Sequence, residues 1–314
     1  MARYVIGADE NGMGPRLGPL VVTAVLARVE EEACPILTRK PRGGLRKRLG
    51  DSKGLVAHGD VSLAEAWARA LVERGAGSAD AGGPDELLRA ISLDGREVLT
   101  EPCPRHVEVQ CWSDEGEQFV DNEWLTPVRG DLRRLAKRGV EVVAVRTVVV
   151  CTKRLNEAVA EGKSRFVVDL HAMERLILQL HQIAGAEVTA VCGKVGGYNR
   201  YGKAFGPLGG RLHVALEEGR ACSTYQFPGL GELSFVRDGD DSHILVGLAS
   251  LVGKWVRELL MGRINRHYQR RDPSLESVSG YYDPTTTRFV VATEDLRRRL
   301  RVPASCFERE KVGR

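Results

Sequence analysis

One segment near the N-terminus restricts the fold of this chain more than any other. An apolar run, Val5–Ala8, ends in two adjacent carboxylates, Asp9 and Glu10. Residues 11–19 then contain three glycines and two prolines, and a second apolar run, Leu20–Leu26, follows them. This order predicts two strands joined by a tight loop, with both acids at the tip of the first strand.

The two acids are expected to point in different directions. Because neighbouring side chains on a strand face opposite ways, Asp9 and Glu10 can bind one metal ion only where the strand ends or bends. The glycines permit such a bend, and they let the loop backbone approach a ligand with its N–H groups free for phosphate oxygens. An acidic pair by itself is more often an ordinary hairpin tip, so the interpretation depends on the whole segment.

The whole segment resembles the N-terminal signature of ribonuclease HII, Asp-Glu-x-Gly-Arg-Gly-Pro-x-x-Gly-Pro, which precedes a valine-rich strand. The sequence matches this signature from Asp9 onward except at Met13, where the family has arginine. The resemblance implies that Asp9 and Glu10 are catalytic metal ligands, with Asp9 bridging two ions. It also assigns nucleic-acid contacts to four residues of the loop: Gly12, Met13, Gly14 and Pro15.

Two later segments resemble the same family in the same order. Asp51-Ser52-Lys53 is similar to its Asp-Ser-Lys motif, which implies that Ser52 and Lys53 hold the nucleic-acid backbone, with Lys53 as the phosphate contact. Asp51 or Ser52 can equally cap the helix that follows, and both roles can coexist. Near the C-terminus, Tyr281 matches the tyrosine of a Gly-Tyr-Pro segment, which implies that it stacks on the sugar at an RNA–DNA junction.

The most informative departure from the family is Cys192. The segment 186–193 predicts a strand, and in the family that strand ends in a metal-binding aspartate at the position of Cys192. The register is supported by Arg200-Tyr201, which also resembles the family pattern. A thiol is a soft and mostly protonated group near neutral pH, so Cys192 marks a degenerate catalytic position.

The remaining acid of the family motif falls on Asp240. Counting back from Ser250 in the Ala-Ser segment places it there, at the start of a predicted helix, and makes it a catalytic metal ligand by resemblance. Asp241, and less so Asp238, are neighbours that could substitute for it. Helix capping is the alternative role for all three, because acids are favoured at helix N-termini.

The resemblance implies an α/β fold, namely a ribonuclease H-like mixed five-stranded sheet flanked by helices, with a helical C-terminal part. It covers a domain at 1–302 that is interrupted by an insertion at about 75–135, and 303–314 is expected to be a tail. The insertion holds Cys103, His106 and Cys111, but a zinc site there lacks a fourth ligand and close pairing, which disfavours it.

Composition sets broader limits. Hydrophobic residues make up 43% of the 314, enough to bury a core, and no apolar run is long enough to span a membrane. Seven cysteines without a disulfide framework, and a strand that starts too early to leave room for a signal peptide, predict a cytoplasmic protein. The net charge of +4 is uninformative, but basic clusters at 39–48 and 297–301 suit either a polyanionic substrate or a solvated face.

Two functions stay open at this point. The first is a Mg²⁺- or Mn²⁺-dependent nuclease that hydrolyses RNA in RNA/DNA hybrids or in duplex DNA with embedded ribonucleotides, acting as a monomer. The second is a catalytically degenerate homologue that keeps the nucleic-acid groove, which the loss of the acid at Cys192 favours. A protein-interaction role of the insertion is a third possibility, and it predicts that the basic clusters do not converge on the acids.

Overall fold

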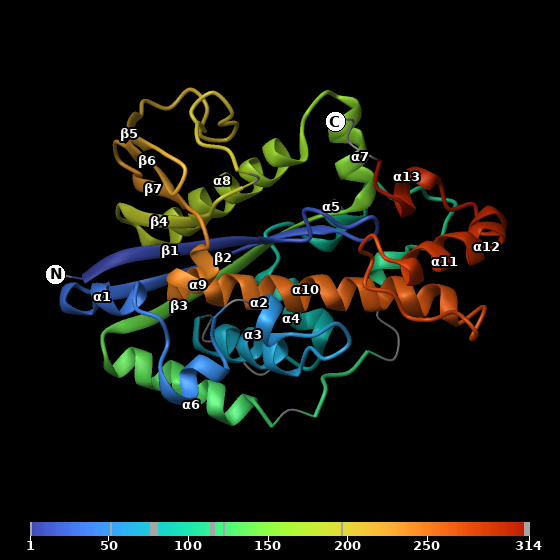
Figure 1. Cartoon of the computed structure of the whole chain (residues 1–314), viewed down its shortest axis with the longest axis horizontal. Helices are drawn as coiled ribbons and strands as arrows, with labels where there is room; N and C mark the ends of the chain where they lie inside the picture. The colour runs from blue at the N-terminus through green and yellow to red at the C-terminus, as the bar shows by residue number, and fades with distance from the viewer. Residues whose placement is uncertain are drawn as a thin grey trace.

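The structure, a computed structural model, describes residues 2–50, 52–75, 81–113, 117–121, 123–195 and 197–310. Its centre is a seven-stranded mixed sheet in the order β3-β2-β1-β4-β7-β6-β5 (Figure 1). The strands are β1 (Ala2–Asn11), β2 (Leu20–Glu30), β3 (Val140–Val150), β4 (Val188–Gly193), β5 (Val214–Glu218), β6 (Cys222–Phe227) and β7 (Gly231–Val236).

The pairing of β1 determines where its acidic tip lies. β1 is antiparallel to β2 along its whole length, up to the pair Asn11↔Val21. On its other side it is parallel to β4, and that pairing stops at Ala8↔Cys192. Asp9 therefore lies one residue beyond the last pair with β4, at the end of a central strand. Pairing with β2 continues to Asn11, where β1 ends, so both acids stand at the tip of the strand without a β4 neighbour, and their side chains leave it on alternate faces.

Helices cover both faces of the sheet (Figure 1). The long helix α10 packs on β1 and β2, and α3 packs beside it on β3, whereas α8 covers the opposite face of β1 and β2. The helices are α1 (Cys34–Leu37), α2 (Ser52–Leu55), α3 (Ser62–Gly75), α4 (Pro84–Ile91), α5 (Arg96–Thr100), α6 (Leu125–Lys137), α7 (Thr152–Ala160), α8 (Arg165–Ala184), α9 (Gly239–Ser242), α10 (Ile244–Gln269), α11 (Pro284–Ala292), α12 (Glu294–Arg299) and α13 (Ala304–Phe307). Short 3₁₀ helices occupy Glu31–Ala33, Gly43–Lys47 and Gln110–Trp112.

Strand alternation separates two hydrophobic cores. On β1, Val5 belongs to the core under α10 and α3, whereas Ile6 and Ala8 belong to the core under α8. The apolar stripe of residues 166–181 lies on α8 and fills the second core. Because both faces of β1 and β2 are buried, these strands read as nearly continuous apolar runs.

The predicted architecture, a mixed sheet flanked by helices, is confirmed, but the expected number of five strands is wrong. The glycine-rich stretch 208–231 contributes β5 and β6 to the sheet. Buried and partly buried side chains alternate along β6, and Tyr225 and Phe227 pack into the core under α8. Alternation of this kind makes a strand stable even where flanking glycines suggest a loop.

The described parts of the predicted insertion and tail pack on this framework. Helix α4 lies against α3 and β3, and the 3₁₀ turn at Gln110–Trp112 lies against α10. At the C-terminal end, Glu308 pairs with Leu17 in an isolated bridge, and the backbone N–H of Arg309 donates to the Arg16 carbonyl at 3.0 Å. Within the described residues, no helix combines the length and apolar character that crossing a membrane requires.

Candidate active site

Asp9 lies where β1, β4 and α10 meet. A Cβ atom placed on Gly193 would stand 2.4 Å from Asp9 Oδ1, so the carboxylate rests directly on the bare backbone at the end of β4. Burial, and next the Glu10 carboxylate, raise the pKa of Asp9 well above its ordinary value. A hydrogen bond with Ser250 lowers that pKa and the charge of Asp240 raises it again. These influences place Glu10, Asp240 and Ser250 around Asp9.

The aspartate at 240 is the acid that approaches Asp9 from the third segment. It lies on α9, a four-residue helix separated from α10 by His243, and its Oδ1 accepts the backbone N–H of Asp241 at 3.1 Å. Asp241 instead pairs with Lys40 at 2.5 Å, and Asp238 is exposed beside Arg237. Of the three candidates, Asp240 therefore has the position that the sequence motif assigns to it.

A hydrogen-bonded chain connects Asp9 to the Asp-Ser-Lys segment. Ser52 is buried, and its hydroxyl lies 2.9 Å from the hydroxyl of Ser250, which bonds Asp9. This arrangement gives Ser52 a supporting role behind the acid, in addition to its place at the start of α2. Asp51 and the side chain of Lys53 lie outside the described residues.

Cys192 is completely buried on the face of β4 that packs against α8. Burial raises the pKa of its thiol, and the charge of Asp169 on α8 raises that pKa further, ahead of the charge of Asp9. The sulfur is therefore a neutral thiol that offers a cation no hard ligand. Asp169 is not among the predicted site residues, yet its charge affects the pKa of Cys192 more than the charge of Asp9 does.

The glycine loop after β1 is supported by arginines that come from distant segments. Arg309 is buried, and it donates from Nε to the Gly18 carbonyl at 2.8 Å and from Nη1 to the Gly12 carbonyl at 2.6 Å. Gly12 has a φ of +90°, and a Cβ there would stand 2.8 Å from Nε of Arg257, so this turn requires glycine twice over. Burial, and then the charges of two neighbouring arginines, lower the pKa of Arg309 to about 9.

The loop residues expected to contact nucleic acid have mixed exposure. Met13 is half-buried and packs against the core under α8, so it fills space instead of presenting a charge. Gly14 is exposed with open space around it, whereas Pro15 is buried. Only the Gly14 region thus presents free backbone to a ligand.

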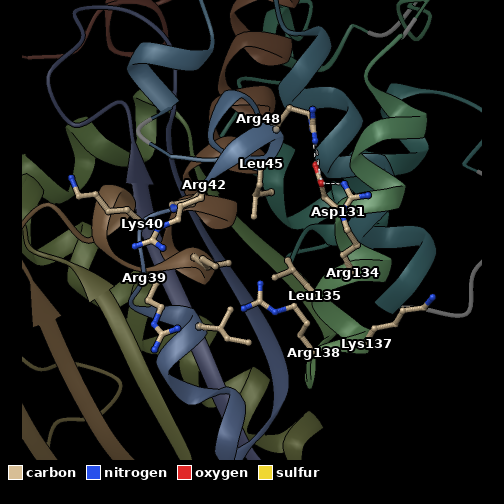
Figure 2. A pocket seen from close by; sticks show the side chains of 14 residues that line it. Arg39, Lys40, Arg42, Leu45, Arg48, Asp131, Arg134, Leu135, Lys137 and Arg138 are labelled. Atoms are coloured by element: carbon tan, nitrogen blue, oxygen red, sulfur yellow. Dashed lines mark hydrogen bonds and ion pairs between the residues drawn. The ribbon is translucent and has the colours of Figure 1, made fainter.

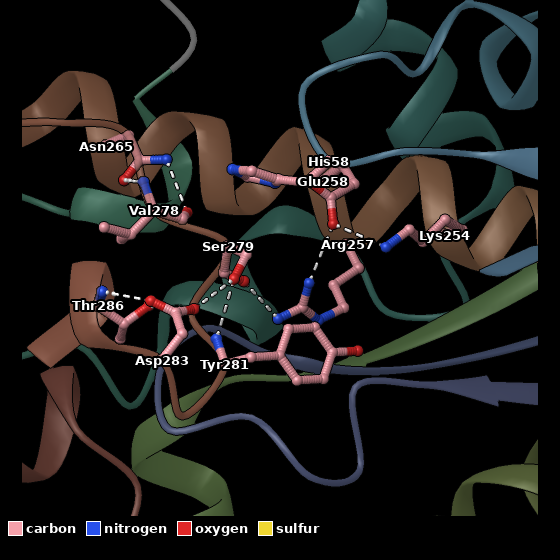
Figure 3. Close-up of polar contacts among 10 residues, drawn as sticks. All are labelled: His58, Lys254, Arg257, Glu258, Asn265, Val278, Ser279, Tyr281, Asp283 and Thr286. Atoms are coloured by element: carbon pink, nitrogen blue, oxygen red, sulfur yellow. Dashed lines mark hydrogen bonds and ion pairs between the residues drawn. The ribbon is translucent and has the colours of Figure 1, made fainter.

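Tyr281 lies above this loop and is 42% exposed (Figure 3). Its ring stands 4.8 Å from the Arg257 guanidinium, which also donates to the Ser279 carbonyl at 2.9 Å. The Gly280 carbonyl accepts the backbone N–H groups of Arg16 and Leu17, so the tyrosine segment is attached to the glycine loop. An exposed ring held in this way is able to stack on a sugar or base.

A basic pocket of about 540 Å³ opens near the start of α10, where Ile244 forms part of its lining (Figure 2). Its walls come from the loop 39–48 and from α6, and its charged lining consists of Arg39, Lys40, Arg42, Arg48, Asp131, Arg134, Lys137 and Arg138. Asp131 pairs with Arg48 at 2.6 Å and also with Arg134. A second hollow shares Arg39, Lys40 and Arg42 and extends to Asp241, the neighbour of Asp240.

The other basic cluster and the cysteine-containing insertion have structural surroundings. Arg297 on α12 caps the preceding helix α11 by donating to the Val290 carbonyl at 2.9 Å, and it covers Phe307. Arg298 pairs with Glu294 and Asp295. Among the residues that the structure describes, no group of three or more His, Cys, Asp or Glu side chains stands ready to hold a metal ion. Neither Cys103, His106 and Cys111 nor the acids around Asp9 form such a group.

Known proteins resemble this chain only loosely. No family model and no curated protein matches the sequence. Among solved structures, RNase HII from Archaeoglobus fulgidus in complex with PCNA is 15% identical, with 98% of this chain and 96% of that chain covered at a TM-score of 0.39. Ribonuclease H2 from Pyrococcus horikoshii OT3 is 13% identical over 97% and 92%, at 0.40, and Bst-RNase HIII in complex with Mn²⁺ is 12% identical over 93% and 71%, at 0.40. Similarity at this level supports no assignment of function, which therefore depends on the residues of the chain itself.

Proposed function

We propose that this chain is a divalent-metal-dependent nuclease that hydrolyses RNA/DNA hybrids or duplex DNA with embedded ribonucleotides. The observation that carries the proposal is the setting of Asp9, which lies on bare backbone at Gly193 with Glu10 and Asp240 as charged neighbours. Carboxylates that raise one another's pKa form a site that favours a cation, because the cation relieves their repulsion.

The residues present suit Mg²⁺ or Mn²⁺. Both ions take oxygen ligands, and Asp9, Glu10 and Asp240 supply carboxylate oxygens from three positions around the end of β1. A bound ion would activate a water molecule and stabilise the charge that develops on the phosphate. The chain itself would orient Asp9 through Ser250 and Ser52 and would exclude water on the side of the buried core.

The surroundings of the acids suit a nucleic-acid backbone. The loop 39–48 brings Arg39 and Arg42 to the hollow that reaches Asp241, and neither arginine forms an ion pair with the described residues. On the other side, Tyr281 offers an exposed ring above the glycine loop. Cations that track phosphates, with an aromatic platform next to them, are the usual means of holding a nucleic-acid strand.

A nucleic-acid-binding protein without hydrolytic activity is the second candidate. It is favoured by the neutral, buried thiol of Cys192 at the place of a ligand and by the lack of a ready metal-binding group among the described side chains. In this alternative the basic loop and Tyr281 keep their roles, and the acids only shape the groove.

Cleavage of a labelled DNA duplex that carries one ribonucleotide tests the proposal, first in Mg²⁺ and then in Mn²⁺. We expect the wild type to cut the duplex and Asp9→Asn, prepared identically, to lose at least about a hundredfold in rate, because removal of one electrostatic stabiliser commonly costs that much. Binding without cleavage by the wild type, with cleavage gained in Cys192→Asp, would support the binding protein instead. Absence of both binding and cleavage would overturn both candidates.

A further inference from the structure

Helix α8 carries a carboxylate where its sequence pattern calls for an apolar residue. Asp169 lies three residues after Phe166 and four before Met173, on the stripe that packs into the core under α8. Its side chain is fully buried, with 0% exposed. Neither of its carboxylate oxygens has a hydrogen-bond partner among the described residues.

An unpartnered carboxylate in this position is unfavourable for folding. Burial of an ionised carboxylate without compensation costs several kilocalories per mole, and an aliphatic residue on the stripe would remove that cost. A second buried acid on the same helix, Glu174, differs from Asp169 because its carboxylate has hydrogen-bond partners. Glu174 is equally buried, but it accepts the backbone N–H groups of Gly206 at 3.1 Å and Leu208 at 2.6 Å. Asp169 thus retains two free acceptor oxygens in the core, which indicates a positively charged ligand.

The location of Asp169 identifies the ligand site. Asp169 lies on the face of α8 that packs into the core holding Ala8 and Cys192, the last pair between β1 and β4. By strand alternation Glu10 follows Ala8 on this same face, whereas Asp9 leaves the strand on the other. In agreement with this placement, burial, then Glu10 and then Asp9, raise the pKa of the Asp169 carboxyl. The carboxylate therefore lies on the same face of the sheet as Glu10 and as Cys192, the position at which the resembled family has its acid.

We propose that Asp169 is a divalent-cation ligand and that it replaces, from helix α8, the carboxylate missing at Cys192 of β4. This inference rests on the proposed function, because it names a ligand of the same metal site. Asp169 would return the number of carboxylates to four, with Asp9, Glu10 and Asp240. A neutral thiol at residue 192 suits this arrangement, since a carboxylate there would repel Asp169 at close range.

Mn²⁺ binding to the full chain, without nucleic acid, tests the inference through the electron paramagnetic resonance signal of the free ion. We expect Asp169→Asn to weaken Mn²⁺ binding at least about tenfold, since even indirect supports of metal ligands contribute that much. Glu174→Gln is the matched control, because it neutralises a buried acid on the same helix that already has its partners; it should keep the wild-type affinity. Asp9→Asn reports on the site as a whole, and circular dichroism of each variant verifies its fold.

A relocated acid provides the second variant. In Asp169→Asn/Cys192→Asp the carboxylate returns to β4, and we expect Mn²⁺ affinity to recover at least partly. If Asp169→Asn binds Mn²⁺ like the wild type while Asp9→Asn does not, the role of Asp169 is overturned and the proposed function stands. If the wild type does not bind Mn²⁺ at millimolar concentration, the metal-dependent function and the role of Asp169 are both overturned. Loss of binding in Glu174→Gln as well would show a general effect of the helix and would also overturn the specific role.

Discussion

At the scale of single residues, the site depends on positions where a side chain is missing as much as on those where one is present. Gly193 leaves room for the Asp9 carboxylate, and Gly12 leaves room for the Arg257 guanidinium. Asp9 lies against the backbone of Gly193, where any side chain would displace its carboxylate. The first prediction concerns this contact, and the second concerns the arginine that supports the glycine loop.

Gly193→Ala should displace the Asp9 carboxylate with little effect on the rest of the fold. The added methyl group would stand 2.4 Å from Asp9 Oδ1, closer than non-bonded atoms approach, so the carboxylate must rotate away. We expect cleavage of the ribonucleotide-containing duplex to fall at least about tenfold, in line with the cost of small displacements at active sites. Gly95→Ala, at a glycine with open space around it, is the control. Equal rates in both variants would contradict the prediction.

Arg309→Ala should loosen the glycine loop. The change removes both hydrogen bonds to the loop carbonyls of Gly12 and Gly18, and hydrogen bonds from charged groups contribute about 1.5–3 kcal/mol each. We expect a lower melting temperature and faster amide hydrogen exchange in residues 11–19. Arg298→Ala, at a surface ion pair, should leave both measurements near the wild type. Unchanged exchange in the loop would show that Arg309 does not support it.

Residue patterns predicted the motif acids but not Asp169, Ser250 or Arg309 as partners of the site. Asp9, Glu10 and the glycine loop are adjacent in sequence, so their spacing carries the information. Asp169 belongs to no motif and lies in an apolar stripe of a core helix, so its only signal in the sequence is an acid at a core position. Arg309 follows the loop that it supports by nearly the whole chain, and no local pattern relates the two.

At the scale of elements, the loop 39–48 and helix α6 form a basic wall around the pocket of Figure 2. The two come from segments about ninety residues apart, and α6 lies partly within the predicted insertion. The sequence indicated a basic loop, but it could not show that α6 adds Lys137 and Arg138 to the same pocket. The second basic cluster, at 297–301, includes Arg297, which caps a helix. A basic cluster in the sequence therefore does not show whether its side chains face a ligand or the protein itself.

The basic wall should determine how strongly hybrid binding depends on salt. In Arg39→Glu/Arg42→Glu, two cations that line the pocket are reversed, so fewer counterions are released on binding. We expect the slope of log Kd against log salt to fall by about 1 for each lost phosphate contact. Arg298→Glu/Arg299→Glu reverses equal charge on α12 and should keep the wild-type slope. Equal slopes for the two double variants would place the nucleic acid elsewhere.

At the scale of the whole molecule, one sheet with a core on each face brings together residues from both ends of the chain. The prediction of a mixed sheet with flanking helices came from the resemblance, because apolar runs and stripes indicate single strands and helices but not their order in a sheet. The expected five strands also came from the resemblance, and β5 and β6 lie in a glycine-rich stretch whose local pattern does not specify how they join the sheet. Burial of acids in this framework also makes stability depend on pH.

The contribution of Glu174 to the free energy of unfolding should decrease as the pH rises from about 4.5 to 7. Burial raises the pKa of Glu174 to about 7, against the opposing backbone hydrogen bonds, so its native state binds a proton more tightly than the unfolded chain does. The stability from this protonation is complete below the unfolded pKa near 4.5 and is lost as the pH passes through about 7. Asp9 and Asp169 shift in the same direction.

Two buried histidines oppose this trend in the same range. Burial lowers the pKa of His243 and of His267 to about 4, so the stability that these groups contribute rises with pH until their ordinary pKa of 6.5 is passed. The Glu174 contribution is therefore measured as the difference in urea unfolding, without metal, between the wild type and Glu174→Gln at several pH values. A difference that stays constant between pH 4.5 and 7 would contradict the assignment.

The most direct test of the account is the position of bound Mn²⁺ in crystals of the wild-type chain, located by its anomalous scattering. The account predicts a peak at the end of β1, within coordinating distance of both the Asp9 and the Asp169 carboxylates. A peak that Asp9 contacts without Asp169 would remove the relocated ligand and keep the metal-dependent site. No peak at Asp9 in saturating Mn²⁺ would contradict the account at its centre and leave a protein that binds nucleic acid without hydrolysing it.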